Sequence, residues 1–553
     1  MRNVMFWVAK RIRRHIPALA AMTLAHMGQA LLGVGFALGT RLVIDSAVSG
    51  EQDAFWEACL IQGGIIAGLL LCQILYRHLH ELLLARLDRQ WKQSLLRDLL
   101  HSEYSEVSQF HSGELLNRMN NDVRILNRGL LDALPNVAAL LTRLVAAVVV
   151  LTALEPWFSL VICGAGGVVI LTTGLLRQHL KKLHKAVSEQ EGRVLGFLQE
   201  TLEKLVMVQA MDAGEEMERR SELLLADRYA AQRKRKNMSL FSNACVNFLS
   251  HAASFGALLW CCAKLLRGQL SFGTLTSVTQ LVSQIQTPAV SLSAVIPQYI
   301  AMTAAAERLQ ELSDLKPEEK PLEQTREELY EGMTAIRAED LCFSYDRDTL
   351  LERVFLELPK GAFAVITGAS GIGKSTLLKL LMGFCKPGSG QLYLEINGNK
   401  LEAGRAVRRL FAYVPQGNLL LSGTLRDNLI IAKPDATGEE IGRALYVSTM
   451  DEYLPQLPAG LETMLGENSA GLSEGQAQRL AIARAILGGA PILLLDECTS
   501  ALDVETEQKV LRRIRELPDR TCIAVTHRPA AIELCDLHLE VTEGQILVRK
   551  MKT

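Results

Sequence analysis

The chain of 553 residues is too long for one hydrophobic core to organise, so at least two domains are expected. Its formal net charge of -1 argues against a nucleic-acid binder that relies on bulk positive charge, and we expect no nucleic-acid partner. The eleven cysteines lack the spacing of a zinc site, and several lie in apolar runs, which indicates reduced, structural side chains.

Apolar stretches in the first part of the chain approach or reach the length of about 20 residues that a helix needs to cross a bilayer. We place six spans at residues 16–40, 58–76, 134–154, 157–176, 243–264 and 272–298. Only Glu155 to Trp157 separate the third span from the fourth, which predicts a tight hairpin. The first span is expected to be retained as an anchor, because it lacks a convincing cleavage site and further spans follow it.

The distribution of charge predicts which side of the membrane each connector occupies. Basic residues gather before the first span and in the connectors at 77–132 and 177–240, where the run Arg233 to Lys236 is an example. The first outer loop, "SGEQDAFWE", is acidic. Because basic connectors stay in the cytosol and an even number of spans returns the chain to its starting side, we expect a multi-pass plasma-membrane protein with both termini cytosolic.

The composition changes near residue 320, where the charged, proline-bearing segment "LKPEEKPLEQTREELYEG" reads as a linker. Downstream, short β-rich runs alternate with helical patterns, which is typical of an α/β domain. We therefore expect a transmembrane domain of six helices at residues 1–315, a linker at 316–332 and a nucleotide-binding domain at 333–553. The nucleotide-binding domain is expected to lie in the cytosol, as are both termini of the chain.

A phosphate loop stands between a predicted strand and a predicted helix. "GASGIGKST" has the glycine, the four-residue spacing and the terminal Gly-Lys-Ser of the pattern that cradles polyphosphates. Its backbone N–H groups and the start of the next helix suit ATP, Lys374 can reach the β and γ phosphates, and Ser375 can ligate Mg²⁺. The predicted ATP contacts here are Gly368, Ala369, Ser370, Gly371, Ile372, Gly373, Lys374, Ser375 and Thr376.

A second apolar strand, "ILLLDE", ends in two carboxylates. Asp496 at the strand tip can bind Mg²⁺ directly or through water, and Glu497 can polarise the water that attacks the γ phosphate. An acidic strand end is often structural when it stands alone. After a phosphate loop, the functional interpretation is favoured.

With these motifs in place, the sequence resembles the ATP-binding cassette (ABC) transporters along essentially its whole length. "LSEGQAQRLAIARAIL", from Leu472, is similar to the family's signature motif and its helix. The resemblance implies that Gln416 in "YVPQ" senses the γ phosphate and binds the metal, that His527 in "VTHR" is the switch histidine, and that Tyr345 stacks on adenine. It also implies further ATP contacts by Ser473, Gly475, Gln476 and, in "SALD", Asp503.

Other segments resemble the exporter branch of the family. "TMLGENSAGLSEGQ" is similar to its cross-linking loop, and "FHSGELLNRMNNDV" to its first intracellular loop. The turns near Glu106 to Glu114 and Val208 to Glu215 resemble the coupling helices that seat on nucleotide domains. The implied fold is an all-α membrane domain of six helices, of the type with domain-swapped helices, fused to an α/β P-loop (RecA-like) domain with a helical subdomain.

One phosphate loop and one signature per chain imply a half-transporter that pairs with a second chain, since the family binds ATP between the loop of one subunit and the signature of the other. An identical and a different partner both stay open, although the complete motif set makes a homodimer self-sufficient. The signature departs from the family at Glu474, where glycine is usual. This carboxylate would repel the γ phosphate if it faced the nucleotide; we favour a side chain that points away and supports the first helical turn.

Polar side chains form stripes along the predicted fifth and sixth spans. Ser277, Gln280, Gln284, Thr287 and Ser291 recur at spacings of three and four, and Asn243, Asn247, His251 and Ser254 form a similar line. Such stripes either join helices or line a wet cavity, because lipid does not accommodate them cheaply. We interpret Ser277, Gln280, Gln284, Thr287, Asn247 and His251 as lining a substrate pathway.

The expected function is ATP-driven export of an amphiphilic small molecule, a lipid or a peptide by alternating access, with Glu497 as general base. Alternatives are an ATP-gated channel or regulatory membrane ATPase, which would share every motif, and a soluble P-loop ATPase acting on DNA, which conflicts with six apolar spans. Membrane lipid and the transported substrate are the other expected partners.

Overall fold

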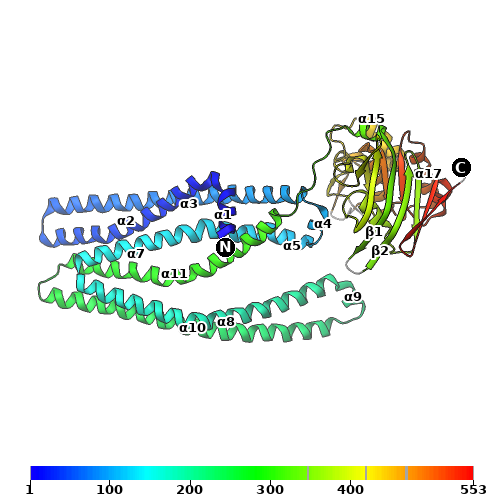
Figure 1. Cartoon of the computed structure of the whole chain (residues 1–553). Coiled ribbons are helices and arrows are strands. Elements are labelled where there is room, and N and C mark those ends of the chain that lie inside the picture. Colours follow the sequence, from blue (N-terminus) through cyan, green and yellow to red (C-terminus); the bar gives the residue numbers. More distant parts are fainter. Residues whose placement is uncertain (1, 346–347, 418–419, 467–470, 552–553) are drawn as a thin grey trace. The chain divides into compact units, whose positions relative to one another are not determined.

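The protein forms two compact units, described here from a computed structural model of residues 2–345, 348–417, 420–466 and 471–551. For some residues inside helices and strands, most of them between 161 and 181, the backbone alone is described. The helical unit comprises Met1–Leu99 and His111–Asp314, and the sheet unit comprises Leu100–Phe110 and Leu315–Thr553. Figure 1 shows the long helices of the first and the strands of the second.

Helices of very different length make up the helical unit. They are α1 (Arg2–Arg11), α2 (Ile16–Ser49), α3 (Gln52–Leu100), α5 (Ser112–Asn117), α6 (Val123–Arg128), α7 (Leu134–Leu154), α8 (Pro156–Glu203), α9 (Leu205–Ala210), α10 (Gly214–Leu266) and α11 (Phe272–Ser313), with the short helices η1 (Arg13–His15), η2 (Arg118–Asp122) and η3 (Gly129–Ala133). Proline lies in the first turn of α2, α7 and α8, where its missing N–H group has no helical partner to lose.

Four helical stretches among the described residues are long and apolar enough to cross a membrane by length and composition. They are Arg13–Ser49, Gln52–Leu100, Ser112–Leu154 and Gly214–Leu266. These stretches contain four of the six predicted spans. The fourth and sixth predicted spans fall in α8 and α11, which are long helices with some side chains outside the description.

The predicted hairpin between the third and fourth spans is present. Helix α7 ends at Leu154 and α8 begins at Pro156, so Glu155 alone connects them. The Glu155 carboxylate is nearly buried and accepts a hydrogen bond of 2.6 Å from Lys264 at the end of α10. This ion pair joins the hairpin to the fifth predicted span.

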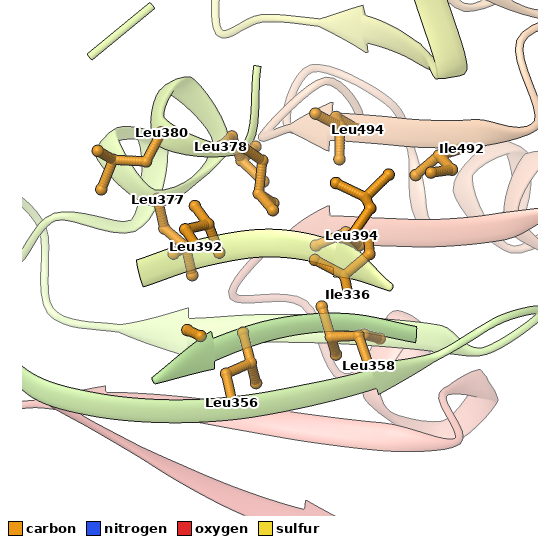
Figure 2. Packing of buried hydrophobic residues seen from close by; sticks show 14 of the residues in the cluster. Ile336, Leu356, Leu358, Leu377, Leu378, Leu380, Leu392, Leu394, Ile492 and Leu494 are labelled. Atoms are coloured by element: carbon orange, nitrogen blue, oxygen red, sulfur yellow. The ribbon is translucent and has the colours of Figure 1, made fainter. Parts of the chain in front are cut away.

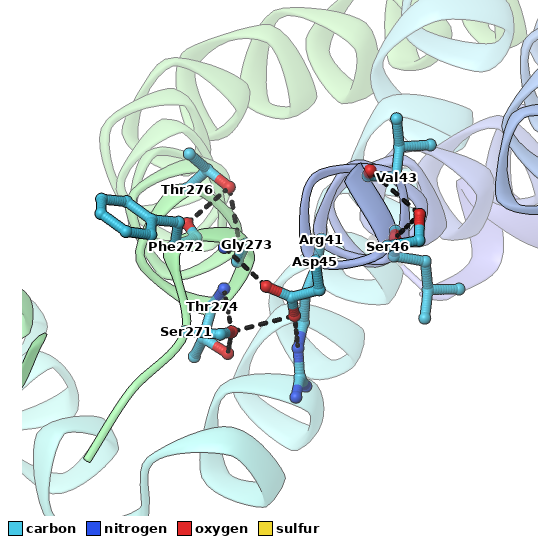
Figure 3. Close-up of polar contacts among 10 residues, drawn as sticks. Arg41, Val43, Asp45, Ser46, Ser271, Phe272, Gly273, Thr274 and Thr276 are labelled. Atoms are coloured by element: carbon cyan, nitrogen blue, oxygen red, sulfur yellow. Dashed lines mark hydrogen bonds and ion pairs between the residues drawn. The ribbon is translucent and has the colours of Figure 1, made fainter. Parts of the chain in front are cut away.

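Asp45 ties the last turn of α2 to the start of α11 (Figure 3). The backbone N–H of Gly273 donates to its Oδ1 over 2.9 Å, and the Ser271 hydroxyl donates to its Oδ2 over 2.9 Å. Glycine is required at 273, because a Cβ there would lie 2.4 Å from the Arg41 carbonyl oxygen. A carboxylate at a helix N-terminus also complements the helix dipole.

Two ion pairs join the end of α11 to the π-helical turn η2. The buried Asp122 carboxylate receives two hydrogen bonds from Arg308, at 2.6 and 2.8 Å. The buried Arg118 guanidinium donates to Glu311 at 2.6 Å and to Glu114 at 2.7 Å. Each buried charge contacts an opposite charge. Removing one partner would leave the other buried and unpaired, which would destabilise the fold because its desolvation would no longer be compensated.

The sheet unit contains two main sheets. Its strands are β1 (Met333–Tyr345), β2 (Asp348–Pro359), β3 (Phe363–Gly368), β4 (Ser389–Ile396), β5 (Asn399–Glu402), β6 (Phe411–Val414), β7 (Gly423–Thr424), β8 (Met464–Leu465), β9 (Ile492–Asp496), β10 (Thr521–Val525), β11 (Leu537–Thr542) and β12 (Gln545–Lys550). Its helices are α4 (Tyr104–Val107), α12 (Arg326–Glu331), α13 (Lys374–Leu381), α14 (Leu425–Ile430), α15 (Gly438–Val447), α16 (Glu474–Leu487), α17 (Val504–Arg515) and α18 (Pro529–Leu534). Short 3-10 turns are η4 (Arg408–Leu410), η5 (Met450–Glu452), η6 (Leu454–Gln456) and η7 (Gly460–Glu462).

The larger sheet has the strand order β12-β11-β3-β10-β9-β6 and is parallel except at β12. The smaller sheet, β2-β1-β4-β5, is antiparallel. Figure 2 shows the apolar core between them, where Ile336 and Leu394 of the smaller sheet, Leu378 of α13 and Leu494 of β9 lie together. A buried strand that is apolar up to its last residue, such as β9, is typical of a parallel sheet covered on both faces.

Part of the predicted linker at 316–332 is ordered within the sheet unit. Helix α12 starts with a capping box between Thr325 and Glu328. Its Leu329 and Tyr330 are buried in the core of the sheet unit. The chain therefore joins this core before the predicted domain start at residue 333.

Candidate functional site

The carboxyl ends of four parallel strands bring the central candidate residues together. Strand β3 leads into the glycine-rich loop, β6 into Gln416, β9 into Glu497 and β10 into His527. Since β6, β9, β10 and β3 are neighbours in the sheet, all four ends lie at one edge. In α/β sheets such an edge is the usual place for a ligand.

The glycine-rich loop has a backbone that only glycine adopts readily. Gly368, Gly371 and Gly373 have φ angles of 149°, 81° and 106°. A Cβ at Gly368 would also lie 2.6 Å from the carbonyl oxygen of Val541. Helix α13 begins directly afterwards at Lys374, so its free N–H groups face the loop, an arrangement that suits a phosphate.

The ammonium group of Lys374 has three acceptors. It donates to the carbonyl oxygens of Gly368 and Ala369 over 2.8 and 3.0 Å and lies 3.0 Å from His527 Nε2. An ammonium group carries three protons, so the protein uses its whole donor capacity. Phosphate oxygens that approach Lys374 would compete with these acceptors for its protons. Loss of the Lys374 contact would then change the hydrogen bonding of His527.

The Asp496 carboxylate is buried at the tip of β9 and has a different partner at each oxygen. The Ser375 hydroxyl donates to Oδ1 over 2.9 Å, and the Tyr413 hydroxyl donates to Oδ2 over 3.0 Å. Burial raises the pKa of Asp496, and the two hydrogen bonds partly offset this effect. Burial, followed by the charge of Asp496, also raises the pKa of Tyr413, so its hydroxyl stays protonated at neutral pH.

Glu497 follows the strand in a left-handed conformation, with a φ of 48°. Its backbone N–H donates to the Val525 carbonyl on β10, which holds it there. Its side chain accepts a hydrogen bond of 2.9 Å from Gln416 and lies 4.0 Å from His527 Nε2. Strain of this kind at a polar strand end is typical of functional sites.

The signature segment caps its own helix. The Ser473 side chain accepts from the backbone N–H of Gln476, and the Gln476 side chain accepts from the backbone N–H of Ser473, which is a capping box at the start of α16. Glu474 is the first helical residue and is exposed. A Cβ at Gly475 would lie 2.9 Å from the Ala501 carbonyl oxygen.

The structure thus separates the predicted ATP contacts into groups. Lys374, His527, Glu497 and Gln416 form one series of contacts, and Ser375 and Asp496, their neighbours in the chain, form a hydrogen-bonded pair; together they are the strand-end cluster. Among the hydrogen bonds of the described residues, none joins Ser473, Gly475 or Asp503 to this cluster; Asp503 caps α17 instead. The Tyr345 side chain and Glu467 of the predicted cross-linking loop lie outside the described residues.

The predicted substrate-pathway residues have varied surroundings. Ser277 is fully buried, and its hydroxyl has no hydrogen-bond partner in the described part of the chain. Gln284 donates to the Gly33 carbonyl oxygen of α2 over 2.7 Å, while Gln280 is half-buried. Asn247 and His251 of α10 are exposed. The Thr287 side chain is outside the description.

The turn after α3, residues Leu100–Phe110, belongs to the sheet unit. Its Glu103 accepts from Lys386 at 2.9 Å and from Lys316 at 3.0 Å. The ring of Tyr104 packs against Phe384, with ring centroids 4.9 Å apart. These contacts hold the turn, which contains α4, within the sheet unit. The other predicted coupling turn, α9, lies in the helical unit.

The sequence interpretation missed Tyr413 and the pair Lys386 and Lys316. Tyr413 was visible as the single hydroxyl in the apolar strand "FAYV", three residues before Gln416. A polar tip on a buried strand end is a usable signal, although it does not reveal the partner. The lysine contacts depend on residues far apart in the chain and leave no local pattern.

We predict that Glu103→Gln loosens the turn at residues 100–110. Burial alone would raise the pKa of Glu103, but hydrogen bonds and charge from Lys386 and Lys316 lower it overall. The exposed lysines limit the ion pairs to about 1 kcal/mol, so amide hydrogen exchange in this segment should be roughly fivefold faster in the variant at pH 7. A lowered pKa means that the stabilisation is present above the unfolded value of about 4.3 and is lost as pH falls through the folded value.

Glu106→Gln is the matched control. Glu106 lies in the same turn and has no ion-pair partner within the described ranges. Its exchange should equal that of the unmodified chain. Equal exchange in Glu103→Gln and the unmodified chain at pH 7 would contradict the proposed contact.

Comparisons with known proteins agree with the two units. The model of the ABC transporter transmembrane region matches residues 19–289, and the ABC transporter model matches residues 351–500. An ATP-dependent lipid A-core flippase of Photobacterium profundum is 30% identical over 451 residues, which cover 79% of this chain and 75% of the flippase. A fatty acid ABC transporter ATP-binding/permease protein of Mycobacterium bovis is 27% identical over 439 residues, covering 79% of this chain and 69% of that protein.

The fold is also that of a solved structure. A bacterial Atm1-family ABC exporter with ATP bound superposes with a TM-score of 0.79 at 23% identity, covering 97% of this chain and 94% of the exporter. The matched regions include most of the apolar helices, the glycine-rich loop, Gln416 and the Asp496–Glu497 strand end, whereas His527 lies beyond the second match. The chain belongs to the ABC transporter family, as a membrane-embedded, ATP-hydrolysing exporter with one transmembrane region and one nucleotide-binding domain.

Proposed function

We propose that this exporter moves an amphiphilic, lipid-like cargo across the plasma membrane as a dimer, with ATP bound at the cluster around Lys374 and Glu497. The observation that carries the assignment of residues is the connected cluster itself. Lys374, His527, Glu497 and Gln416 lie in one series of contacts of 2.9 to 4.0 Å at the strand ends. A phosphate-binding cation, a carboxylate base and two polar sensors are the groups that phosphoryl transfer to water needs.

The roles follow from the geometry. The loop and the start of α13 would hold the β and γ phosphates, and Lys374 would neutralise their charge. Glu497 would accept a proton from the attacking water, since its carboxylate is partly exposed and oriented by Gln416. His527 contacts Lys374 and lies 4.0 Å from Glu497, between the phosphate-binding cation and the base. It would therefore stabilise charge on the γ phosphate.

The oxygen ligands of the site fit Mg²⁺. The Ser375 hydroxyl and the Asp496 Oδ1 lie 2.9 Å apart, so one small cation could contact both. Hydroxyl and carboxylate oxygens are ligands that Mg²⁺ accepts together with phosphate oxygens. Gln416 is the third predicted ligand, and it lies at the neighbouring carboxylate. Bound Mg²⁺ would supply charge neutralisation and alignment of the phosphates.

We predict that Glu497→Gln lowers the rate of ATP hydrolysis at least roughly 100-fold, because a general base typically contributes that much or more. ATP binding should persist, since the amide keeps the shape of the side chain. The measurement is steady-state phosphate release by the full chain in proteoliposomes, alongside binding of radiolabelled ATP.

Glu505→Gln is the matched control, because Glu505 is an exposed glutamate in the first turn of α17, away from the cluster. Hydrolysis by Glu497→Gln near the control rate would reject Glu497 as the base. Cargo movement down its gradient that continues in Glu497→Gln with ATP bound would favour the ATP-gated channel over the pump.

The choice of a lipid-like cargo is supported by relatives and by the helices. One relative is named a lipid A-core flippase and another a fatty acid transporter. Among the pathway candidates, Gln280 is half-buried and Asn247 and His251 are exposed, so they are available to a polar headgroup. Gln284 is occupied by the Gly33 carbonyl oxygen and is better explained by helix packing. Stimulation of ATP hydrolysis by lipid, drug or peptide panels would distinguish the three cargo classes.

The dimer is supported by the tip of the second connector. Helix α9 presents Val206, which is 82% exposed, together with Leu205 and Met207, and Met211 directly after the helix is also exposed. Exposed apolar groups that gather in this way mark an interaction surface. A second copy of this chain is the proposed occupant, because each copy has one phosphate loop and one signature, and α9 would seat on the sheet unit of the partner. Both termini and the sheet units would lie in the cytosol.

We predict that Val206→Asp lowers the ATP hydrolysis rate about tenfold, because an unpaired charge would be buried where α9 meets the partner. The measurement is the hydrolysis rate in lipid nanodiscs, with native mass spectrometry of the assembly. Leu223→Asp is the control, since Leu223 is an exposed leucine on α10 outside the tip. A Val206→Asp protein with normal activity, or a fully active monomer, would contradict the dimer arrangement.

A further inference from the structure

The two oxygens of the Asp496 carboxylate are distinguished by their partners. Oδ1 faces the Ser375 hydroxyl at 2.9 Å, on the side of the phosphate loop. Oδ2 accepts from the Tyr413 hydroxyl at 3.0 Å. A carboxylate at the end of a strand can rotate about its last bond, so hydrogen bonds at fixed positions decide which oxygen faces the loop.

Tyr413 is held in place by the sheet. Strand β6 runs parallel to β9, with Tyr413 paired to Leu494 and Val414 to Leu495. The Tyr413 ring packs against the apolar core, while its hydroxyl reaches the tip of β9. Three residues later, Gln416 donates to Glu497. One strand end therefore contacts both adjacent carboxylates of the site.

We propose that Tyr413 is a positioning residue for the divalent cation of the ATP site, and that its hydroxyl fixes Asp496 with Oδ1 turned toward Ser375. The inference rests on the proposed function, because it concerns the cation that Ser375 and Asp496 would share. Tyr413 donates to the oxygen that faces away from Ser375, so it does not compete with the cation for Oδ1. It acts through Asp496 and touches neither nucleotide nor metal.

The physical reason is the entropic cost of fixing a metal-coordinating carboxylate in one orientation. A carboxylate already held in one rotation loses less freedom when it binds a cation than one that turns freely. Hydrogen-bond partners behind metal ligands typically change metal affinity by about 10- to 100-fold when they are removed. The affinity of the phosphate loop for metal-free ATP should be unaffected, because the loop contacts do not include Tyr413.

The test uses Mn²⁺ as a spectroscopic probe on the full chain in detergent, with Glu497→Gln present in every sample to prevent hydrolysis. Mn²⁺ binding in the presence of ATP is followed by electron paramagnetic resonance. Tyr413→Phe keeps the ring and removes the hydroxyl, so we expect roughly tenfold weaker Mn²⁺ binding. Binding of ATP in EDTA should change less than twofold.

Two further variants make the result interpretable. Tyr393→Phe removes a hydroxyl that donates to Glu339 over 2.5 Å, outside the site, and should leave Mn²⁺ binding unchanged. Tyr413→His has a ring N–H that falls short of the Tyr413 hydroxyl position, so it should bind Mn²⁺ as weakly as Tyr413→Phe. Unchanged Mn²⁺ affinity in Tyr413→Phe, or an equal loss of metal-free ATP binding, would overturn the inference. Absence of ATP-dependent Mn²⁺ binding in the chain with Tyr413 intact would instead contradict the proposed cation site.

Discussion

The parallel pairing of β3, β10, β9 and β6 is the constraint on which the proposed ATP site depends. Each strand contributes its carboxyl end to the same edge, so groups from four distant segments meet there without any local sequence connection. A shift of one residue in the pairing of β6 with β9 would turn the Tyr413 side chain to the other face and remove its contact with Asp496. Such a shift would also disturb close side-chain packing, because every side chain of β9 and of its neighbour β10 is buried.

The residues at this edge are linked because several acceptors share the ammonium group of Lys374 as their hydrogen-bond donor. Lys374 bonds two loop carbonyl oxygens and His527, and His527 in turn lies near Glu497. Phosphate binding that draws Lys374 away would therefore also change the surroundings of His527 and Glu497. In this scheme the state of the nucleotide is communicated through hydrogen bonds of about 3 Å, and no large internal movement is needed at the first step.

Within each unit, charge pairs at the ends of long helices join one element to another. In the helical unit, Asp122 and Arg308 join η2 to the last turns of α11. In the sheet unit, Glu103 fastens the turn after α3 between two lysines. Both links use a carboxylate less exposed than its basic partner, so each favours one defined arrangement of its elements. Rigid elements joined in this way can transmit a displacement between two states.

The motifs were predictable from sequence because their chemistry is local. The glycines of the phosphate loop, Lys374, and the acidic end of "ILLLDE" have fixed spacings that follow from backbone geometry. The helical stripe in α11 was also visible, but periodicity does not say which neighbour a stripe faces. Gln284 bonds a backbone oxygen of α2, while Gln286, which was not in the predicted stripe, reaches Ser254 of α10. Tyr413 and the lysines around Glu103 depend on contacts between distant segments, which no single stretch of sequence encodes.

The central claim is that ATP bound at the strand-end cluster drives movement of cargo through the membrane. The most direct measurement is translocation of a fluorescent lipid in sealed proteoliposomes that contain Lys374→Ala. Because Lys374 is the cation that faces the phosphates in the proposed site, the account predicts that ATP-dependent translocation is lost. Translocation that continues at the rate of the unmodified chain would contradict it.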